Sequence, residues 1–135
     1  MKKILIIDDE EEMCWALEKT LSQDDYIVIT STSGSEGMQI FANVSVDLVL
    51  LDIKIKESNG LVILEQIRKK DSKVPVLIMT GYSSISLALE AIDKGATGYL
   101  TKPVKVSNLR EMLRELLLGE SAEKVHDEPW NNRHN

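Results

Sequence analysis

The feature that most constrains the fold of this chain is a regular alternation between short, continuous apolar runs and segments with the period of a helix. The apolar runs cover residues 4–7, 26–30, 48–51, 76–79 and 98–100. Runs of this length without polar interruptions are typical of strands that are buried on both faces. Strands of this kind, each followed by a helix, predict a parallel sheet with helices on both sides.

The segments that follow the apolar runs carry apolar residues three and four positions apart, which is the pattern of an amphipathic helix. These segments are marked by Met13, Leu17 and Leu21; residues 34–42; Leu61, Leu64 and Ile67; Ile85, Ala88, Leu89 and Ile92; and Leu109, Met112, Leu113 and Leu116. Glycines at positions 34, 60, 95 and 119 lie at the boundaries. We therefore expect an α/β fold, a flavodoxin-like (βα)5 doubly wound parallel sheet with strand order 2-1-3-4-5.

Size and charge exclude several classes of function. The 135 residues suit one domain, which we place at residues 1–118, followed by a polar, flexible tail at 119–135. The net charge of −6 argues against an electrostatic grip on nucleic acid. The single cysteine, Cys14, cannot form an internal disulfide, and no apolar run approaches the roughly 20 residues of a membrane span. We therefore expect a cytoplasmic protein that binds neither nucleic acid nor a membrane.

Histidine chemistry is excluded from the predicted domain, because His126 and His134 both lie in the tail. Nucleophile pairs of the Ser-His or Cys-His type therefore cannot form in the domain. Imidazole metal sites are excluded for the same reason, so any metal there must be held by oxygen atoms. Oxygen ligands favour a hard cation such as Mg²⁺, Mn²⁺ or Ca²⁺.

Polar side chains follow four of the five predicted strands, at the point where each strand ends. Asp8 and Asp9 follow the first strand, Asp52 the third, Thr80 the fourth and Lys102 the fifth. The carboxyl ends of parallel strands share one edge of the sheet, and doubly wound sheets bind their ligands there. Each residue taken singly can be explained as a helix start, a turn, a helix cap or a solvated lysine. Their common position on one edge predicts a functional site.

Three aspartates at one edge would repel each other, by about 4 kcal/mol for two charges about 4 Å apart at an effective dielectric of about 20. A bound proton or a bound cation would relieve this repulsion, and Mg²⁺ held by carboxylates and water fits the ligand set. An aspartate can also act as a nucleophile toward phosphorus, with the metal, Lys102 and the hydroxyl of Thr80 binding the transferring group. The glutamates at positions 10–12 are instead interpreted as the solvated first turn of a helix.

The chain resembles the receiver domains of response regulators. The resemblance runs from Lys3 to about Leu118 and rests on the segments ILIIDDEEEM, DLVLLDIKI, NGLVIL, VPVLIMTGY and EAIDKGATGYLTKP. Trp15 and the segment MTGY add a likeness to receivers of the NtrC subfamily. The resemblance implies two-component signal transduction, in which a sensor histidine kinase or a phosphotransfer protein supplies a phosphoryl group. The chain would then be a phosphoacceptor and not a turnover enzyme, as a stand-alone receiver or as one part of a longer regulator.

The resemblance also implies a role for each acid and its neighbours. Asp52 would be the residue that is phosphorylated. Asp9 and Asp52 would bind Mg²⁺ directly, Asp8 would bind it through water, and Lys54 would bind it through its backbone carbonyl. These assignments belong to the resemblance, whereas the clustering of the acids follows from the strand ends themselves.

The remaining assignments concern the switch between two states. Thr80 would hydrogen-bond the phosphoryl group, and Lys102 would pair with it, aimed by a cis peptide bond before Pro103. Thr80 would move toward the phosphoryl group, and Tyr99 would then turn inward. This movement would change the face formed by helix 4, strand 5 and helix 5, through which an output partner or a second copy would bind.

Two further expectations concern the predicted partner face and the loop after the acceptor. We expect Leu87 and Leu118 to be exposed and to contribute to docking or dimer formation. The family usually has a proline near position 56, whereas this chain has Lys56, so the loop loses a restraint on φ. We expect this loop to be more mobile and the chemistry of the site to be retained.

Three rival functions are compatible with the same fold class. A phosphatase of the haloacid dehalogenase type would need D-x-D-x-[TV] after the first strand, where this chain has DDEEE. A flavin-binding module would need phosphate-binding hydroxyls and glycines at that place, and acids would repel a phosphate there. A scaffold with a vestigial site is the third rival, and the presence of all five polar groups argues against it.

Overall fold

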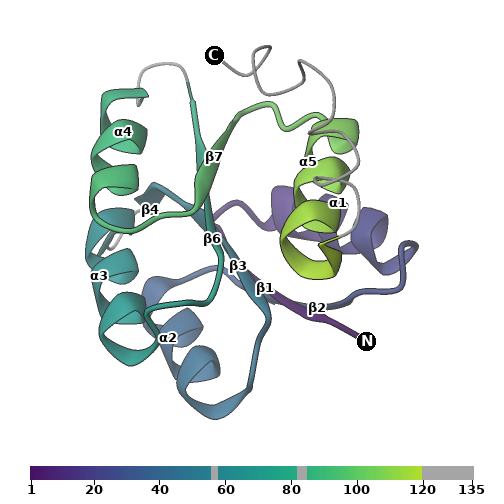
Figure 1. The fold of residues 1–135 in the computed structure, drawn as a ribbon, viewed down its shortest axis with the longest axis horizontal. Helices are drawn as coiled ribbons and strands as arrows, with labels where there is room; N and C mark the ends of the chain where they lie inside the picture. Colours follow the sequence, from purple (N-terminus) through teal and green to yellow (C-terminus); the bar gives the residue numbers. More distant parts are fainter. Residues whose placement is uncertain (56–57, 82–84, 120–135) are drawn as a thin grey trace. The chain divides into compact units, whose positions relative to one another are not determined.

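The computed structural model describes residues 1–55, 58–81 and 85–119. The chain divides into two compact units, Met1–Pro103 and Val104–Asn135. Figure 1 shows the succession of elements along the chain. The larger unit holds the described strands and helices α1 to α4, and it contains every residue that the sequence assigned to the metal and phosphoryl site.

Five strands of the larger unit form one parallel sheet. They are β1 (Lys3–Ile7), β2 (Ile27–Ser31), β3 (Leu48–Asp52), β6 (Val76–Thr80) and β7 (Gly98–Thr101). Their order is β2-β1-β3-β6-β7, which confirms the predicted order 2-1-3-4-5 of the five apolar runs. In the register, Ile7 of β1 lies beside Leu51 of β3, and Thr80 lies beside Thr101. Neighbouring strands therefore end close together, and the residues that follow them share one edge of the sheet.

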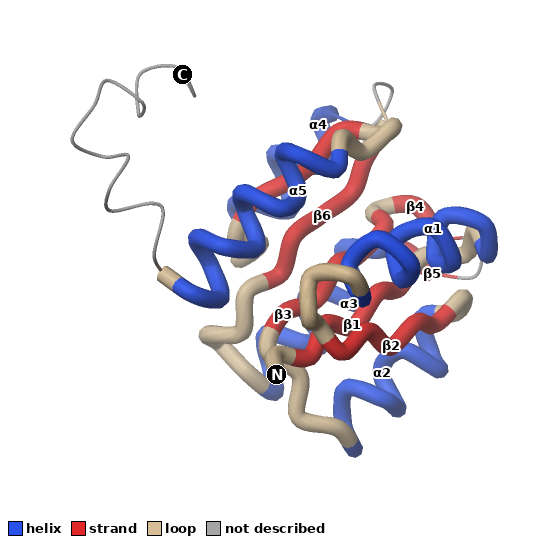
Figure 2. Tube along the Cα trace, turned by 90° about the vertical axis from the view of Figure 1, so that its right-hand side faces the viewer, coloured by secondary structure: helices blue, strands red, loops and turns tan. Residues whose placement is uncertain are grey.

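The helices of the larger unit cover both faces of the sheet, as predicted. Helix α1 (Glu11–Ser22) lies on one face, and the other face carries α2 (Gly34–Asn43), α3 (Gly60–Lys70) and α4 (Ile85–Asp93) (Figure 1, Figure 2). Two of these helices begin with side-chain caps that satisfy free backbone N–H groups. Ser33 Oγ accepts from the backbone N–H of Glu36 at 3.1 Å, and Asn59 Oδ1 accepts from that of Leu61 at 2.8 Å.

The core of the larger unit is built from the apolar runs. Every residue of β3 and of β6 is buried, which explains why these runs show no polar alternation. Burial of one leucine or isoleucine side chain in this way stabilises the fold by about 1.5–3 kcal/mol. Among the described residues, the buried polar ones are Asp8, Ser31, Asp52 and Thr80, all at the carboxyl ends of strands. Burial of polar groups is therefore concentrated at the edge where the site is predicted.

A short antiparallel pair lies between β3 and α3, and the sequence did not predict it. It joins β4 (Lys54–Ile55) to β5 (Ser58–Asn59). Strands of two residues are too short to show the period of two by which strands are recognised in a sequence. Lys56 falls between them, outside the described residues, so the effect of the missing proline stays a prediction.

Gly60 begins α3 directly against the backbone at the end of β3. A Cβ atom at this position would lie 2.7 Å from the carbonyl oxygens of Asp52 and Ile53. Backbone atoms cannot give way as a flexible side chain can, so we expect Gly60→Ala to lower the free energy of unfolding by about 1–3 kcal/mol. Urea unfolding measures this loss. Gly81→Ala is the matched control, because its Cβ would meet nothing within 4 Å; an equal loss in both variants would contradict the steric argument.

The orientation of α4 differs from the prediction. Leu87 was expected to be exposed, but it is half-buried and packs against the core. Ala88 and Ala91 are fully buried, whereas Leu89 is 56% exposed and Ile92 is 37% exposed. The prediction was wrong because six of the nine residues of α4 are apolar and they are spread around the helix, so its sequence fits more than one choice of buried face. Leu89 and Ile92, and not Leu87, supply the exposed apolar surface of this helix.

The smaller unit begins with α5 (Val106–Leu113), which confirms the fifth predicted helix. The helix continues as a π-helical turn, η2 (Arg114–Leu118), and Leu118 is 51% exposed, as expected. Gly119 follows with a φ of 63°, the left-handed conformation that glycine adopts most easily at a helix end. Residues 120–135 fall outside the described part of the chain, so the boundary after residue 118 stays a prediction.

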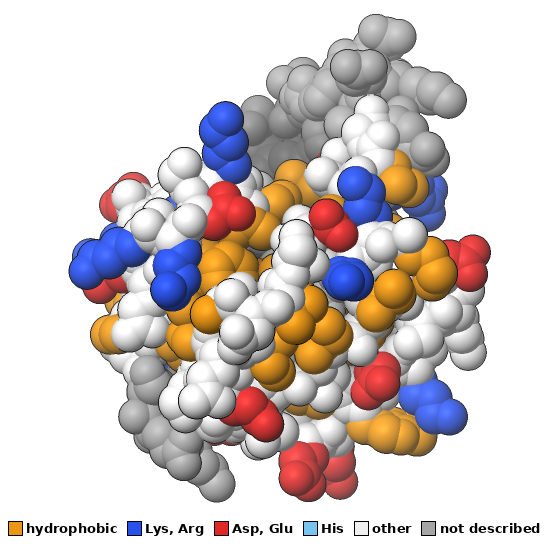
Figure 3. Space-filling view, turned by 90° about the horizontal axis from the view of Figure 1, so that it is seen from below, with side chains coloured by type: hydrophobic (Ala, Val, Ile, Leu, Met, Phe, Trp, Pro, Cys, Tyr) orange, Lys and Arg blue, Asp and Glu red, His pale blue; other side chains and the backbone are white. Residues whose placement is uncertain are grey.

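The surface seen from below carries charges of both signs. In Figure 3, apolar side chains gather toward the middle of this face, and separate Lys, Arg, Asp and Glu side chains lie among and around them.

In residues 1–55, 58–81 and 85–119, no helix is both long enough and apolar enough to cross a membrane.

Candidate functional site

The five polar residues singled out in the sequence all lie at the carboxyl edge of the sheet. Asp8 and Asp9 directly follow β1, Asp52 ends β3, Thr80 ends β6, and Lys102 directly follows β7. The parallel arrangement of the strands produces this grouping, because each chain leaves its strand at the same edge. The site is thus assembled from residues that are up to 94 positions apart in the sequence.

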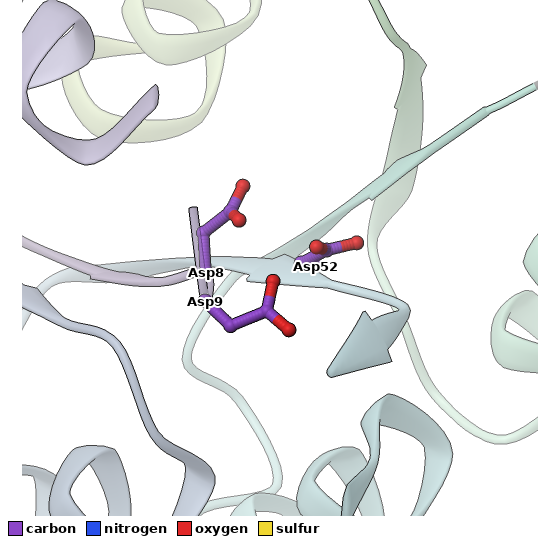
Figure 4. Close-up of side chains that lie close together, drawn as sticks. All are labelled: Asp8, Asp9 and Asp52. Atoms are coloured by element: carbon purple, nitrogen blue, oxygen red, sulfur yellow. The ribbon is translucent and has the colours of Figure 1, made fainter. Parts of the chain in front are cut away.

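The three aspartates form one cluster, as predicted. Each offers a carboxylate oxygen, and these oxygens all lie within 4.8 Å of one another. In Figure 4 the side chains of Asp8, Asp9 and Asp52 lie close together. Asp8 is fully buried, Asp52 is 6% exposed and Asp9 is half-buried. Clustered and poorly hydrated carboxylates of this kind need positive charge nearby.

Asp8 is fixed by contacts on all sides. Its Oδ1 accepts from the backbone N–H of Glu10 at 3.0 Å, and its Oδ2 accepts from Nζ of Lys102 at 3.0 Å. Its backbone N–H donates to the carbonyl of Ser31 at 3.0 Å, and its own carbonyl accepts from the Cys14 thiol at 3.2 Å. These bonds hold a buried carboxylate in one orientation, as a satisfied buried polar group requires.

Lys102 supplies the positive charge of the site. Its ammonium lies 3.0 Å from Asp8 Oδ2, 3.0 Å from Glu10 Oε1 and 3.3 Å from Asp52 Oδ2. The peptide bond between Lys102 and Pro103 is cis, as the resemblance implied. The lysine therefore reaches back over the edge of the sheet toward the ends of β1 and β3.

Burial and charge shift the pKa values of this group in a consistent way. Burial and, next in size, the charge of Asp8 together raise the pKa of Asp52 to about 6, against the lowering effect of Lys102 and of the Lys54 backbone N–H. Burial of the Lys102 ammonium acts to lower its pKa, but hydrogen bonds to Asp8 and Glu10 outweigh burial, so its pKa is raised. Lys102 therefore stays charged at neutral pH, while Asp52 is held close to protonation.

The remaining predicted residues are Thr80 at the end of β6, Tyr99 on β7 and Lys54 on β4. Thr80 is fully buried, and its hydroxyl donates to the carbonyl of Gly81 at 3.1 Å. Tyr99 lies on β7, with 38% of its surface exposed. The backbone N–H of Lys54 donates to Asp52 Oδ1 at 3.2 Å, so the chain just after β3 is hydrogen-bonded to the Asp52 carboxylate.

Sequence reasoning missed Glu10. We interpreted it as part of a solvated helix start, and it is the exposed N-cap residue of α1, but its carboxylate also pairs with Lys102, which we did not predict. Its neighbours Glu11 and Glu12 are exposed in the first turn of α1, as expected. No local pattern distinguishes Glu10 from these two, because the contact depends on a lysine 92 positions away.

Comparison with known proteins agrees with this geometry. The profile of the response regulator receiver domain family matches residues 4–114, so the chain belongs to that family. It is a receiver domain of the type found in two-component systems. The match covers the whole described sheet except Lys3, including every residue of the site.

Individual relatives point to the same group. The chain is 37% identical to the transcriptional regulatory protein ZraR of Escherichia coli over 114 residues, which are 84% of this chain and 26% of ZraR. The chain thus spans about a quarter of the length of this relative. A receiver domain structure from Clostridium thermocellum is 32% identical with a TM-score of 0.84, covering 90% of this chain and 98% of that one. The receiver domain of NtrX from Brucella abortus is 28% identical with a TM-score of 0.81, and the match covers 84% of this chain and 97% of that one. These matches agree with the expected likeness to NtrC-type regulators.

Proposed function

We propose that Asp52 accepts a phosphoryl group from a phosphohistidine of a sensor kinase or a phosphotransfer protein. A carboxylate oxygen of Asp52 forms a bond to phosphorus, the bond from phosphorus to the donor nitrogen breaks, and the electron pair returns to the imidazole. The observation that supports this proposal best is the position of Asp52. Its carboxylate ends β3 beside two other aspartates and 3.3 Å from the Lys102 ammonium, in a chain of the receiver family.

The ligand set of the site fits Mg²⁺. The three clustered side chains, Asp8, Asp9 and Asp52, offer only oxygen atoms, which this hard cation prefers. The backbone carbonyl of Lys54, next but one to Asp52, would complete the protein ligands. When bound, the ion would neutralise the carboxylates and the charge that develops on the transferring phosphoryl group.

Lys102 and Thr80 bind the phosphoryl group once it is on Asp52. The ammonium of Lys102 already lies beside the acceptor oxygen, so it can pair with a phosphoryl oxygen after a small shift. The hydroxyl of Thr80 is buried at the end of the neighbouring strand and can exchange its bond to the Gly81 carbonyl for a phosphoryl oxygen. Each exchange of partners stabilises the arrangement that the site has when Asp52 is phosphorylated over its resting arrangement, as a population shift requires.

The output follows from the same exchange. When Thr80 turns toward the phosphoryl group, Tyr99 on the adjacent strand β7 can turn inward from its partly exposed position. Beside it, α4 offers Leu89 and Ile92 as exposed apolar contacts for an output partner or a second copy. The corresponding role of α5, predicted from the sequence, stays a prediction.

The acceptor is modified once and not turned over on a pool of substrate, so the chain does not act as a phosphatase of small esters. In an assay with p-nitrophenyl phosphate and Mg²⁺, we expect no release of nitrophenol above that of buffer. Sustained release would favour the rival hydrolase function instead.

Acetyl phosphate tests the proposal directly. We expect the protein to gain one phosphoryl group by intact mass when it is incubated with acetyl phosphate and Mg²⁺, and to lose that gain with a chelator. Asp52→Asn should show no gain, because an amide oxygen is a far weaker nucleophile than a carboxylate. Asp93→Asn, which removes an exposed acid of α4, is the matched control and should react like the wild type. A gain retained in Asp52→Asn would refute Asp52 as the acceptor.

A further inference from the structure

Lys102 pairs with one acid more than the proposed metal and phosphoryl site requires. Asp8 and Asp52 belong to the aspartate cluster, whereas Glu10 belongs to neither the cluster nor the acceptor strand. We propose that Glu10 is a positioning residue that holds the Lys102 ammonium in the resting site and competes with the phosphoryl group for it. This inference rests on the proposed function and assigns Glu10 a regulatory part in the same reaction.

The number of donors on the ammonium makes the competition unavoidable. A lysine ammonium has three N–H donors. In the resting site it has three carboxylate partners, at 3.0, 3.0 and 3.3 Å. A phosphoryl oxygen that binds Lys102 must therefore replace one of them or share a donor with it.

Burial decides which partner is released most easily. Asp8 is fully buried, and an uncompensated buried charge costs several kcal/mol. Asp52 carries the phosphoryl group itself, so it stays next to the lysine. The side chain of Glu10 is 63% exposed, and water can solvate its carboxylate as soon as it leaves the ammonium. Glu10 is therefore the partner that gives way.

The same contact has two consequences for the reaction. While Asp52 is unmodified, Glu10 keeps Lys102 over the site and adds a negative charge beside the path of an incoming phosphate. Once Asp52 is phosphorylated, Glu10 competes for the ammonium that holds the phosphoryl oxygens. Both consequences oppose phosphorylation, so Glu10 would raise the donor concentration at which the receiver responds.

Glu10→Gln tests the inference, with Glu11→Gln as a control that removes the same charge from an exposed position one residue away. The measurement is the second-order rate constant of phosphorylation by acetyl phosphate at saturating Mg²⁺, followed by intact mass. We expect Glu10→Gln to raise this rate constant about 1.5-fold to fivefold, which is the range of one exposed ion pair, and Glu11→Gln to leave it nearly unchanged. Unfolding in urea checks that both variants fold like the wild type.

A second comparison separates an effect through Lys102 from plain repulsion of the donor. In a Lys102→Met background, the gain from Glu10→Gln should largely disappear, because the two residues are coupled through one contact. An equal gain in that background, an equal gain in Glu11→Gln, or a slower reaction of Glu10→Gln would each overturn the inference. Failure of the wild type to be phosphorylated at all would refute the proposed function instead, so the two failures are distinguishable.

Discussion

Asp52→Asn is expected to stabilise the metal-free protein at neutral pH, although it abolishes the proposed acceptor. Burial raises the pKa of Asp52 from its ordinary value of 3.8 to about 6, so the folded protein resists ionisation of this side chain. Ionisation at neutral pH therefore costs the fold about 2–3 kcal/mol, and a neutral amide of nearly the same shape avoids that cost. Lys102 keeps its two other partners, Asp8 and Glu10, in the variant.

The raised pKa of Asp52 makes the stability of the wild type fall as the pH rises. Between about pH 4 and pH 6 the folded state binds a proton at Asp52 that the unfolded state has lost, so stability falls as the pH rises through this window. Above this pH window, the stability that the proton on Asp52 contributes is fully lost. Asp52→Asn should lack this contribution, so its advantage over the wild type should be small near pH 4 and full near pH 7.

Urea unfolding in the presence of a chelator, at a series of pH values, measures this difference. Asp93→Asn, which removes an exposed carboxylate, should show no comparable gain. Addition of Mg²⁺ should stabilise the wild type and narrow the gap, because a cation relieves the repulsion that the amide removes. A destabilised Asp52→Asn at neutral pH would mean that the pair with Lys102 outweighs burial and repulsion by Asp8.

Lys102→Met is expected to have the opposite effect on stability. The ammonium lies within 3.3 Å of two buried or nearly buried carboxylates, Asp8 and Asp52, and its removal leaves their charges uncompensated. Removal of one partner from a buried ion pair costs about 3–5 kcal/mol, so we expect a loss of that order in metal-free urea unfolding at neutral pH. The aliphatic part of the side chain is retained, so the loss reports the charge and not the packing.

Lys94→Met is the matched control for this variant. Lys94 also pairs with a carboxylate, that of Glu65 at 3.1 Å, but both side chains are solvent-exposed. We expect little change in its stability, because water solvates both charges once the pair is broken. Equal losses in the two variants would show that burial of the aspartates does not determine the effect of Lys102.

Asp52→Asn is expected to stabilise the protein and Lys102→Met to destabilise it. These opposite effects show how the site differs from the rest of the core. The apolar strands stabilise the fold, whereas the carboxyl edge of the sheet holds several carboxylates close together with only the Lys102 ammonium to balance their charges in the described site. Such arrangements persist at functional sites because the chemistry needs them and the surrounding structure tolerates their cost. Here the surrounding structure is a sheet in which β3 and β6 are entirely buried.

The sequence was sufficient for the fold because its signals are local and repeated. Continuous apolar runs identified all five strands of the main sheet, and the strand order is that of the flavodoxin-like fold that these runs led us to expect. Where the local signal was weak, the prediction failed or was missing. Helix α4, whose apolar residues are spread around its circumference, was assigned the wrong buried face, and the two-residue strands β4 and β5 were not anticipated.

The sequence by itself determined that Asp8, Asp9, Asp52, Thr80 and Lys102 share one edge, because a parallel sheet brings the ends of its strands together. Only the tertiary structure decided which partners the Lys102 ammonium has, and it added Glu10 to the two aspartates. The physical reason is that strand ends are fixed by local periodicity, whereas an ion pair depends on side-chain directions and burial. Those are set by chain segments 50 to 94 residues apart.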